Sequence, residues 1–285
     1  MTVPAAVLEA APRAGRVRLL ETPLVGREAL ARDTWLLHFE DAELARTIAP
    51  GQFLMLGLRP PSAAAFLKRP FSVADAAGAR VSFVLRTYGP GTAEMAHRRI
   101  GDRFDLLGPF GRGFRVGGSQ RVVMVAGGIG LAPFYLLARR LKELAEPPET
   151  VLVYGERSPA SLIRGLDAFP AFDRVLLYTE EEDGAGRGTV VDGFRALARE
   201  GALAGARLCA CGPRRMLEAL EVERERLEVP AEYSLEERMG CGFGICQGCV
   251  VPANPAHADQ AYHLLCRSGP VMDPERILWP HQALP

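Results

Sequence analysis

The sequence of 285 residues predicts a β + α/β fold: an antiparallel six-stranded barrel, a parallel-sheet α/β domain and a small cysteine-rich subdomain. Short apolar runs alternate with Gly/Pro turns over residues 16–118, whereas strand and helix patterns alternate over residues 119–226. Residues 227–285 carry four of the six cysteines. We therefore expect three structural units after a flexible Ala/Pro-rich tail at residues 1–15.

The first unit is predicted to be a barrel because several of its apolar runs show a period of two, as in Val81–Leu85. The expected strands are Gly15–Thr22, Thr34–Phe39, Gln52–Leu58, Phe71–Asp75, Arg80–Thr87 and Arg103–Leu107. Only one short helix is expected, at Thr92–Arg99, and a Gly-Thr pair caps its N-terminus.

The second unit begins with a continuous apolar strand, Arg121–Ala126, followed by a glycine-rich turn and a helix at Ala132–Leu144. Further strands are expected at Thr150–Tyr154, Arg174–Tyr178 and Arg207–Ala210, with helices at Ser161–Asp167, Val191–Glu200 and Arg214–Arg226. Strands that alternate with helices in this way form a parallel sheet with crossover helices.

The four cysteines of the third unit have the spacing C-x4-C-x2-C-x16-C, which begins like that of plant-type [2Fe–2S] ferredoxins. They are Cys241, Cys246, Cys249 and Cys266. Glycines between them allow the backbone to wrap a cluster and direct N–H groups at its sulfurs. A four-cysteine zinc site is the alternative, but such sites usually contain two C-x2-C pairs and this segment contains one. The remaining two, Cys209 and Cys211, are expected to be buried apolar residues.

Two glycine-containing motifs flank the α/β unit. Gly127, Gly128 and Gly130, with Pro133 in the following helical turn, form a candidate pyrophosphate turn, although a tight structural turn is the alternative reading. The tripeptide Cys211-Gly212-Pro213 ends the last expected strand. Ligands collect at the carboxyl ends of strands in open α/β sheets, so both motifs are expected to face one crevice.

The barrel carries a third motif, Arg69-Pro70-Phe71-Ser72. It is either an edge-strand segment with a solvated arginine or a flavin seat, with Arg69 on a diphosphate and Ser72 near the reactive ring nitrogen. Gly89-Pro90-Gly91-Thr92 begins the short helix and could add backbone N–H groups to the same phosphates.

The order of these motifs resembles the ferredoxin-NADP reductase-like superfamily over about residues 16–226. With the cysteine motif that follows, the chain resembles the electron-transfer subunits of dihydroorotate dehydrogenase. The segment Ser234–Gly244 is similar to that family's entry into its cluster loop, and the acidic loop Thr179–Gly184 to its nicotinamide-side segment.

The resemblance implies three cofactors and their ligands. FAD is expected at Arg69, Pro70, Phe71, Ser72, Arg86, Thr87, Tyr88, Gly91 and Thr92; NAD is expected at Gly127, Gly128, Gly130, Pro133, Cys211, Gly212 and Pro213. The [2Fe–2S] ligands are expected to be Cys241, Cys246, Cys249 and Cys266. Arg157 could accept a 2′-phosphate and favour NADP, but NAD is the expected cofactor. The implied units are an FAD-binding barrel (16–118), an NAD-binding domain (119–226) and a cluster subdomain (227–285).

The implied function is electron transfer in pyrimidine biosynthesis, from the FMN of a catalytic partner subunit through [2Fe–2S] and FAD to NAD, within a heterotetramer. Flavin can join these carriers because it is stable in one- and two-electron forms. No catalytic acid/base pair is identified in this chain. The alternatives are a reductase component that serves an oxygenase or hydrogenase and a zinc-stabilised binding module without redox activity.

Composition limits the partners. The 34 Lys and Arg residues balance 34 Asp and Glu residues, so neither nucleic acid nor an anionic membrane surface is expected. No apolar run is long enough to span a bilayer, and Met1–Ala14 does not have the pattern of a secretory signal. A thiolate-bound cluster without an export signal favours the cytoplasm.

Overall fold

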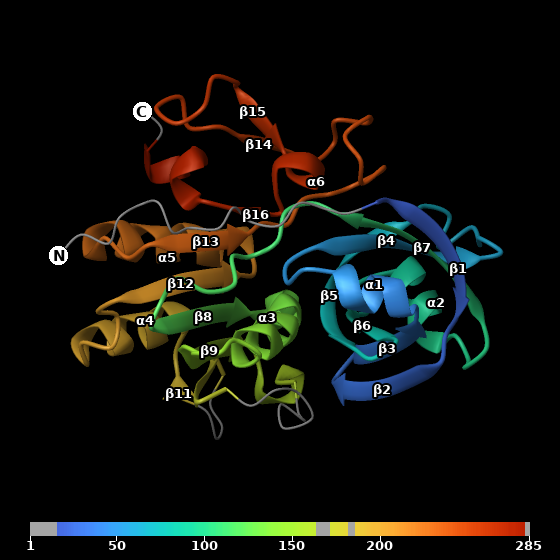
Figure 1. Cartoon of the computed structure of the whole chain (residues 1–285), viewed down its shortest axis with the longest axis horizontal. Helices are drawn as coiled ribbons and strands as arrows, with labels where there is room; N and C mark the ends of the chain where they lie inside the picture. The colour runs from blue at the N-terminus through green and yellow to red at the C-terminus, as the bar shows by residue number, and fades with distance from the viewer. Residues whose placement is uncertain (1–15, 164–171, 182–185, 283–285) are drawn as a thin grey trace.

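The computed structural model describes residues 16–163, 172–181 and 186–282, and this part of the chain contains two seven-stranded sheets and a two-stranded hairpin (Figure 1). The first sheet is antiparallel and curled, and the second is mostly parallel. The hairpin belongs to the cysteine-rich unit, which lies across both sheets in Figure 1. The β + α/β fold class predicted from the sequence is confirmed.

The antiparallel sheet has seven strands, not the six expected. They are β1 (Arg18–Pro23), β2 (Gly26–Ala31), β3 (Thr34–Glu40), β4 (Phe53–Arg59), β5 (Arg69–Ala77), β6 (Arg80–Arg86) and β7 (Arg103–Phe110), in the order β1-β7-β4-β5-β6-β3-β2. The unexpected strand is β2, which buries only Leu30 and therefore lacks a clear apolar alternation.

The expectation of a single helix in this unit was also wrong. Besides α2 (Pro90–His97), the chain forms α1 (Ala42–Thr47), whose N-cap Asp41 accepts a hydrogen bond of 2.7 Å from the Leu44 N–H. This helix has only six residues and buries two of them, Leu44 and Ala45. An element this short has too few residues to display a helical period.

The second sheet has the order β11-β10-β9-β8-β12-β13-β16. Its strands are β8 (Arg121–Gly127), β9 (Glu149–Glu156), β10 (Arg174–Thr179), β11 (Gly186–Arg187), β12 (Ala206–Cys211), β13 (Ala231–Ser234) and β16 (Val271–Met272). The ladders are parallel except for β16, which pairs antiparallel with β13. Sequence reasoning missed β11, β13 and β16 because each has four residues or fewer.

Helices cover both faces of this sheet, as the alternating side chains of its buried strands require. Val122, Met124 and Ala126 face α3 (Ala132–Lys142), whereas Val123 and Val125 belong to the core formed with α4 (Val190–Arg199) and α5 (Arg214–Leu227). Residues 164–167 of the expected helix at Ser161–Asp167 lie outside the described residues. The described residues before them form a short 3-10 turn, Pro159–Ser161.

The two sheets meet where α3 packs against β5. Phe134 and Ala138 of α3 belong to the same buried cluster as Ala74 of β5. At the edge of this interface Arg139 makes two hydrogen bonds to Asp75, of 2.6 and 2.9 Å. One helix therefore joins the antiparallel sheet to the parallel sheet.

Gly130 allows the turn after β8 to lie directly against the end of β12. A Cβ atom at Gly130 would lie 2.3 Å from the carbonyl oxygen of Cys211 and 2.8 Å from the Gly212 nitrogen. The two motifs that the sequence placed at one crevice are thus in backbone contact. As expected, Cys209 and Cys211 are buried, with 0% and 2% of their surfaces exposed.

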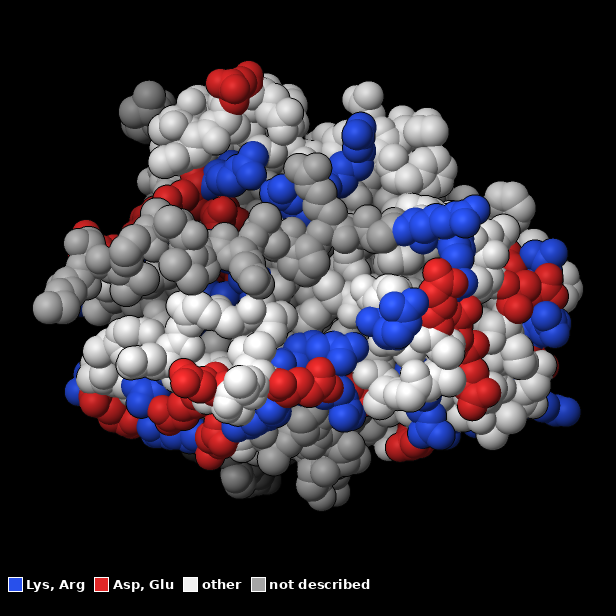
Figure 2. All heavy atoms as spheres, viewed as in Figure 1, with Lys and Arg blue, Asp and Glu red and all other residues white. Residues whose placement is uncertain are grey.

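On the face drawn in Figure 2, basic and acidic side chains of the described residues lie interspersed. This distribution agrees with the balanced charge of the sequence. Within the described residues, every helix is too short or too polar to serve as a membrane span.

Replacing Gly130 by Ala tests this backbone contact. We expect Gly130→Ala to lower the free energy of unfolding by about 2 kcal/mol or more, because the atoms it meets belong to the backbone of β12 and cannot turn away. Denaturant titration measures the change. Gly89→Ala is the matched control: a Cβ there meets no atom within 4 Å, so its effect should stay below about 1 kcal/mol. An equal loss of unfolding free energy in the two variants would contradict the close contact between Gly130 and the end of β12.

Candidate functional site

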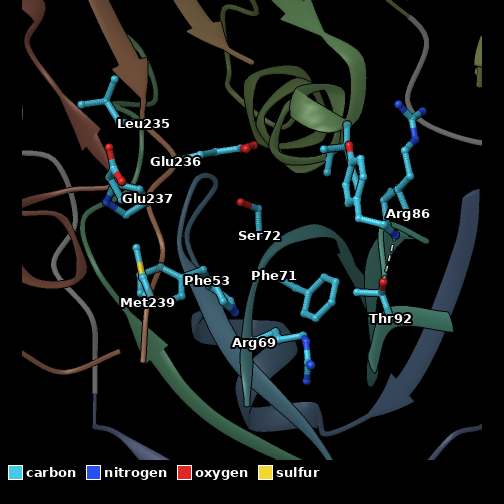
Figure 3. A pocket seen from close by; sticks show the side chains of 16 residues that line it. Phe53, Arg69, Phe71, Ser72, Arg86, Thr92, Leu235, Glu236, Glu237 and Met239 are labelled. Carbon is cyan, nitrogen blue, oxygen red and sulfur yellow. Dashed lines mark hydrogen bonds between the residues drawn. The ribbon is translucent and has the colours of Figure 1, made fainter. Parts of the chain in front are cut away.

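A cavity lies between the antiparallel sheet, the start of α3 and the segment after β13 (Figure 3). It is lined by Phe53, Arg69, Pro70, Phe71, Ser72, Val84, Arg86, Tyr88, Thr92, Ile129, Ala132, Leu235, Glu236, Glu237, Met239 and Pro270. The structure thus brings together seven of the nine residues predicted for FAD. We refer to this space as the flavin cavity.

Arg69 and the start of α2 form one end of the flavin cavity. The Arg69 guanidinium donates hydrogen bonds to the carbonyl oxygens of Leu67 and Ala64, of 2.7 and 3.0 Å, and these bonds fix its position. A Cβ at Gly91 would lie 2.1 Å from Arg69 Nη2, so glycine is required for the arginine to reach the helix. A guanidinium beside a helix N-terminus is a suitable site for a diphosphate.

Two side chains approach the flavin cavity from opposite elements. Ser72 lies on β5, and Glu236 follows β13 and extends into the cavity (Figure 3). Burial raises the pKa of Glu236, although its side chain stays accessible from the cavity. Glu236 was not predicted as a site residue, because the short strand that positions it was itself missed.

A second cavity lies at the carboxyl ends of the parallel strands. It is lined by Arg86, Tyr88, Gly127, Gly128, Ile129, Gly155, Glu156, Arg157, Glu180, Gly188, Thr189, Val190, Val191, Arg195, Pro213, Arg215, Met216, Ala219 and Glu236. We refer to it as the nucleotide cavity. It shares Arg86, Tyr88, Ile129 and Glu236 with the flavin cavity, so the two spaces are adjacent.

One end of the nucleotide cavity, at the start of α5, is suited to an anion. The first residues of α4 and α5 line the cavity, and α5 has no acidic residue in its first turn and no side-chain cap. Instead, Arg214 and Arg215 stand there, although the helix dipole disfavours positive charge at this end. A bound phosphate would offset this repulsion and would accept hydrogen bonds from the free backbone N–H groups at the N-terminus of α5.

Several predicted residues position these cavities without lining them. Among the described residues, Thr87, Gly91, Gly130, Pro133, Cys211 and Gly212 are absent from both linings. Gly130 packs on Cys211 and Gly212, whereas the Thr87 N–H donates to the Asp33 carbonyl oxygen at 2.9 Å. The sequence motifs therefore include both cavity-lining residues and residues that hold the backbone.

Besides Glu236, two acidic residues line the nucleotide cavity that were not predicted individually as site residues, although one of them, Glu180, belongs to the acidic loop Thr179–Gly184. Glu156 ends β9, and its carboxylate is engaged by Arg86 and Tyr154. Glu180 directly follows β10. Its place after an apolar strand was the available signal, since ligands of open α/β sheets collect at the carboxyl ends of strands.

A hairpin brings two of the four cysteines together. β14 (Val250–Pro252) pairs with β15 (Tyr262–Leu264), which places Cys249 opposite the start of α6 (Leu265–Ser268) and thus beside Cys266. The Leu265 N–H donates to the Cys249 carbonyl oxygen at 2.9 Å, and the Cys266 N–H points at the Cys249 Sγ at 3.5 Å.

The other pair, Cys241 and Cys246, is formed by the glycine-rich loop itself. The Cys246 N–H points at the Cys241 Sγ at 3.5 Å. Although burial alone would raise it, the pKa of Cys241 is lowered to about 6 by hydrogen bonds from the backbone of Cys246, Phe243 and Ile245. Gly242 and Gly244, with φ of +85° and +91°, allow this loop conformation.

This donor set fits a two-iron cluster. Among the described residues, no three His, Cys, Asp or Glu side chains converge on the position of a single ion. Instead the thiols form two pairs, Cys241 with Cys246 and Cys249 with Cys266, and a [2Fe–2S] cluster needs two thiolates on each iron. Backbone N–H groups directed at the sulfurs are the hydrogen bonds that tune such clusters.

The segment Met239–Cys249, which we call the cluster loop, also reaches the flavin cavity. Met239, two residues before Cys241, lines that cavity. Phe243 packs on Phe110 with ring centroids 6.2 Å apart, and Phe110 packs on the cavity residue Phe53 at 5.7 Å. The three candidate cofactor sites therefore form one continuous series from the cysteines to the nucleotide cavity.

Two family models match the chain. The iron-sulfur cluster binding domain of dihydroorotate dehydrogenase B matches residues 236–278, and the oxidoreductase NAD-binding domain matches residues 124–221. The first match spans all four cysteines, and the second spans the glycine turn and the Cys211–Pro213 tripeptide.

Curated relatives match over nearly their whole length. The dihydroorotate dehydrogenase B (NAD(+)) electron transfer subunit of Caldanaerobacter subterraneus is 32% identical over 81% of this chain and 87% of its own. The subunit of the same name from Geobacillus thermodenitrificans is 34% identical over 90% of this chain and 96% of its own.

Solved structures share the fold. A chain of an NADH-dependent reduced ferredoxin-NADP oxidoreductase aligns with a TM-score of 0.78 at 24% identity, covering 92% of this chain and 91% of its own. A ferredoxin reductase of carbazole 1,9a-dioxygenase aligns with a TM-score of 0.65 at 22% identity, covering 76% of this chain and 69% of its own. The architecture is thus that of ferredoxin reductases.

The lowered pKa of Cys241 gives a pH-dependent prediction for the metal-free, reduced chain. Its thiolate should already predominate at neutral pH, so iodoacetamide should modify Cys241 with a midpoint of about pH 6. An ordinary thiol has its midpoint near 8.5. Mass spectrometry of the modified peptides reports the midpoint. Cys209 and Cys211 are internal controls, because burial raises both pKa values and they should stay unmodified. A midpoint above pH 8 for Cys241 would refute the hydrogen-bonded loop.

Proposed function

Because this chain belongs to the family of dihydroorotate dehydrogenase B electron transfer subunits, we propose that it transfers electrons from the FMN of a catalytic partner subunit through a [2Fe–2S] cluster and FAD to NAD. Dihydroorotate is then oxidised on the partner, and this chain delivers the electrons as NADH. The proposal places the chain in pyrimidine biosynthesis and in the cytoplasm.

The observation that carries this proposal is the continuity of the three sites. The cluster loop contributes Met239 to the flavin cavity, and the flavin cavity shares four residues with the nucleotide cavity. Such a series suits a relay, because FAD exchanges single electrons with a cluster and a hydride with nicotinamide. A binding module without redox activity has no need for this arrangement.

The chain's own residues bind and orient the cofactors. Arg69 and the N-terminus of α2 hold the FAD diphosphate, while Phe71 and Ser72 contact the flavin ring. At the nucleotide cavity, the uncapped start of α5 and Arg215 hold the pyrophosphate of NAD. Ile129 and Tyr88 line both cavities and so lie where the two cofactors would meet.

Glu180 supports NAD over NADP. A carboxylate at the end of β10 can accept hydrogen bonds from the adenine ribose, whereas it repels a 2′-phosphate. Arg157 and Arg195 also line the cavity, but Arg195 is already paired with Glu223 and Asp192. We therefore assign the ribose to Glu180 and NAD as the acceptor.

The partner is proposed to dock at the cluster-side surface, which we define as Val17, Phe243, Ile245, Val250 and Tyr262. All five are exposed apolar residues, with Ile245 at 75% and Tyr262 at 58%. Four of them line a groove that also includes Cys266, and Ile245 is adjacent to the exposed Cys246. A partner seated here would approach the cluster closely and could complete a heterotetramer.

The visible spectrum of anaerobically purified protein, recorded before and after NADH is added, tests the proposed function. We expect flavin and [2Fe–2S] bands in the oxidised protein and bleaching of both with NADH. NADPH should require at least about tenfold higher concentration for the same bleaching, because we assign the adenine ribose to Glu180, whose carboxylate would repel a 2′-phosphate. A colourless, zinc-containing protein would overturn the relay, and equal responses to NADPH would overturn the assignment of Glu180.

Ile245→Glu tests the docking surface. A charge at this exposed position should weaken binding to the catalytic subunit by about tenfold or more, because interface centres exclude unpaired charge. Titration calorimetry with the purified catalytic subunit measures the change. The control is Val222→Glu on α5, an apolar residue exposed to 47% outside the cluster-side surface. Bleaching by NADH should be retained in both variants. Unchanged affinity in Ile245→Glu would place the partner elsewhere.

A further inference from the structure

The wall between the two cavities contains an ion pair that joins the two sheets. Arg86 ends β6 of the antiparallel sheet, and Glu156 ends β9 of the parallel sheet. The guanidinium makes two hydrogen bonds to the carboxylate, Nη2 to Oε1 at 2.6 Å and Nη1 to Oε2 at 3.2 Å. Only 13% of the Arg86 side chain and 5% of the Glu156 side chain are exposed.

Neighbouring groups hold both side chains in place. Arg86 Nε donates to Thr34 Oγ1 at 2.9 Å, and Nη2 also donates to the Ser161 carbonyl oxygen at 3.4 Å. On the other side, the Tyr154 hydroxyl donates to Glu156 Oε1 at 2.8 Å and accepts the Ile163 N–H at 3.3 Å. The pair is therefore part of a network that crosses from one sheet to the other.

The pair lies between the proposed binding sites. Arg86 lines both cavities, and Glu156 lines the nucleotide cavity. A Cβ built on Gly128 would lie 3.5 Å from Arg86 Nη1 and 3.9 Å from Glu156 Oε2, so the pair also borders the glycine turn. Arg86 was predicted to bind FAD, but its guanidinium is engaged by protein groups in this structure.

We propose that Arg86 and Glu156 are positioning residues for hydride transfer: they fix the distance between the flavin on one sheet and the nicotinamide on the other. The proposal rests on the proposed function. In the proposed direction, N5 of FADH⁻ would give a hydride to C4 of NAD⁺, so that FADH⁻ and NAD⁺ become FAD and NADH; bleaching of the flavin by NADH is the reverse of this step. The reacting atoms must lie about 3–3.5 Å apart, and a displacement of about 1 Å slows such steps roughly 100-fold.

A second ion pair provides a matched control. Arg139 and Asp75 join α3, which covers the parallel sheet, to β5 of the antiparallel sheet, with hydrogen bonds of 2.6 and 2.9 Å. Neither residue lines the flavin or the nucleotide cavity. If any ion pair between the two halves of the molecule could fix the distance between flavin and nicotinamide, removal of either pair would slow hydride transfer equally.

The test compares Arg86→Met/Glu156→Gln with Arg139→Met/Asp75→Asn in the FAD-loaded full-length chain. Both double variants remove the charges together, which avoids leaving a buried carboxylate unpaired. Stopped-flow absorbance measures the limiting rate of flavin bleaching by NADH, and titration measures the dissociation constants of FAD and NAD⁺. Hydrogen–deuterium exchange of the Ile163 amide is followed before NADH is added, because its acceptor Tyr154 belongs to the network.

We expect the limiting rate to fall at least about tenfold in Arg86→Met/Glu156→Gln, with both dissociation constants within about threefold of wild type. Exchange at Ile163 should accelerate in this variant alone, and the control should keep its limiting rate within about twofold. Arg86→Lys should recover part of the rate, since lysine keeps the charge but not the two-pronged hydrogen bond.

Three results would overturn the proposal: an unchanged limiting rate, an equal loss in the control, or unaltered exchange at Ile163. FAD affinity reduced tenfold or more would also overturn it and identify Arg86 as a flavin ligand. If NADH fails to bleach the wild-type flavin, the proposed function fails instead, and the exchange measurement alone then decides whether the pair fixes the interface.

Discussion

The packing of α3 against β5 is the contact on which both the flavin cavity and the nucleotide cavity depend. β5 carries Arg69–Ser72, the motif of the flavin cavity, and α3 begins directly after the glycine turn of the nucleotide cavity. Because α3 buries its apolar side against the strand, the two motifs are held at the two ends of one interface. The Arg139–Asp75 pair adds directional contacts to this mainly apolar interface, and the Arg86–Glu156 pair joins the two sheets at the ends of β6 and β9.

The cluster loop depends on a different constraint, the pairing of β14 with β15. That hairpin brings Cys249 and Cys266 together although sixteen residues separate them in the chain, whereas Cys241 and Cys246 are brought together by local loop conformation. The loop then lies against the antiparallel sheet: a Cβ at Gly242 would lie 2.6 Å from Met55 Cγ. The cysteines are thus positioned relative to the flavin cavity by backbone pairing and by one close contact.

Sequence reasoning identified the motifs because each needs specific residue types at fixed spacing. The four cysteines, the glycine turn and Arg69–Ser72 are such cases, and most of the predicted FAD residues do line one cavity. It missed elements whose stability comes from their neighbours, such as β2, which buries only Leu30, and β13, whose four residues are too few to show a pattern. Consequently it also missed Glu236, which follows β13, and Glu156, whose partner Arg86 is 70 residues away. Long-range partners of this kind leave no local signal in one sequence.

The strand β16 gives the cysteine-rich unit a role beyond holding thiols. It covers β13 at one end of the parallel sheet, where Tyr233 pairs with Met272 and Ser234 with Val271. Without it, β13 would present a row of unpaired backbone groups to other molecules, and such edges promote association between sheets. The C-terminal unit therefore covers part of an edge of the parallel sheet, so the fold of that sheet depends on residues beyond the last cysteine, Cys266.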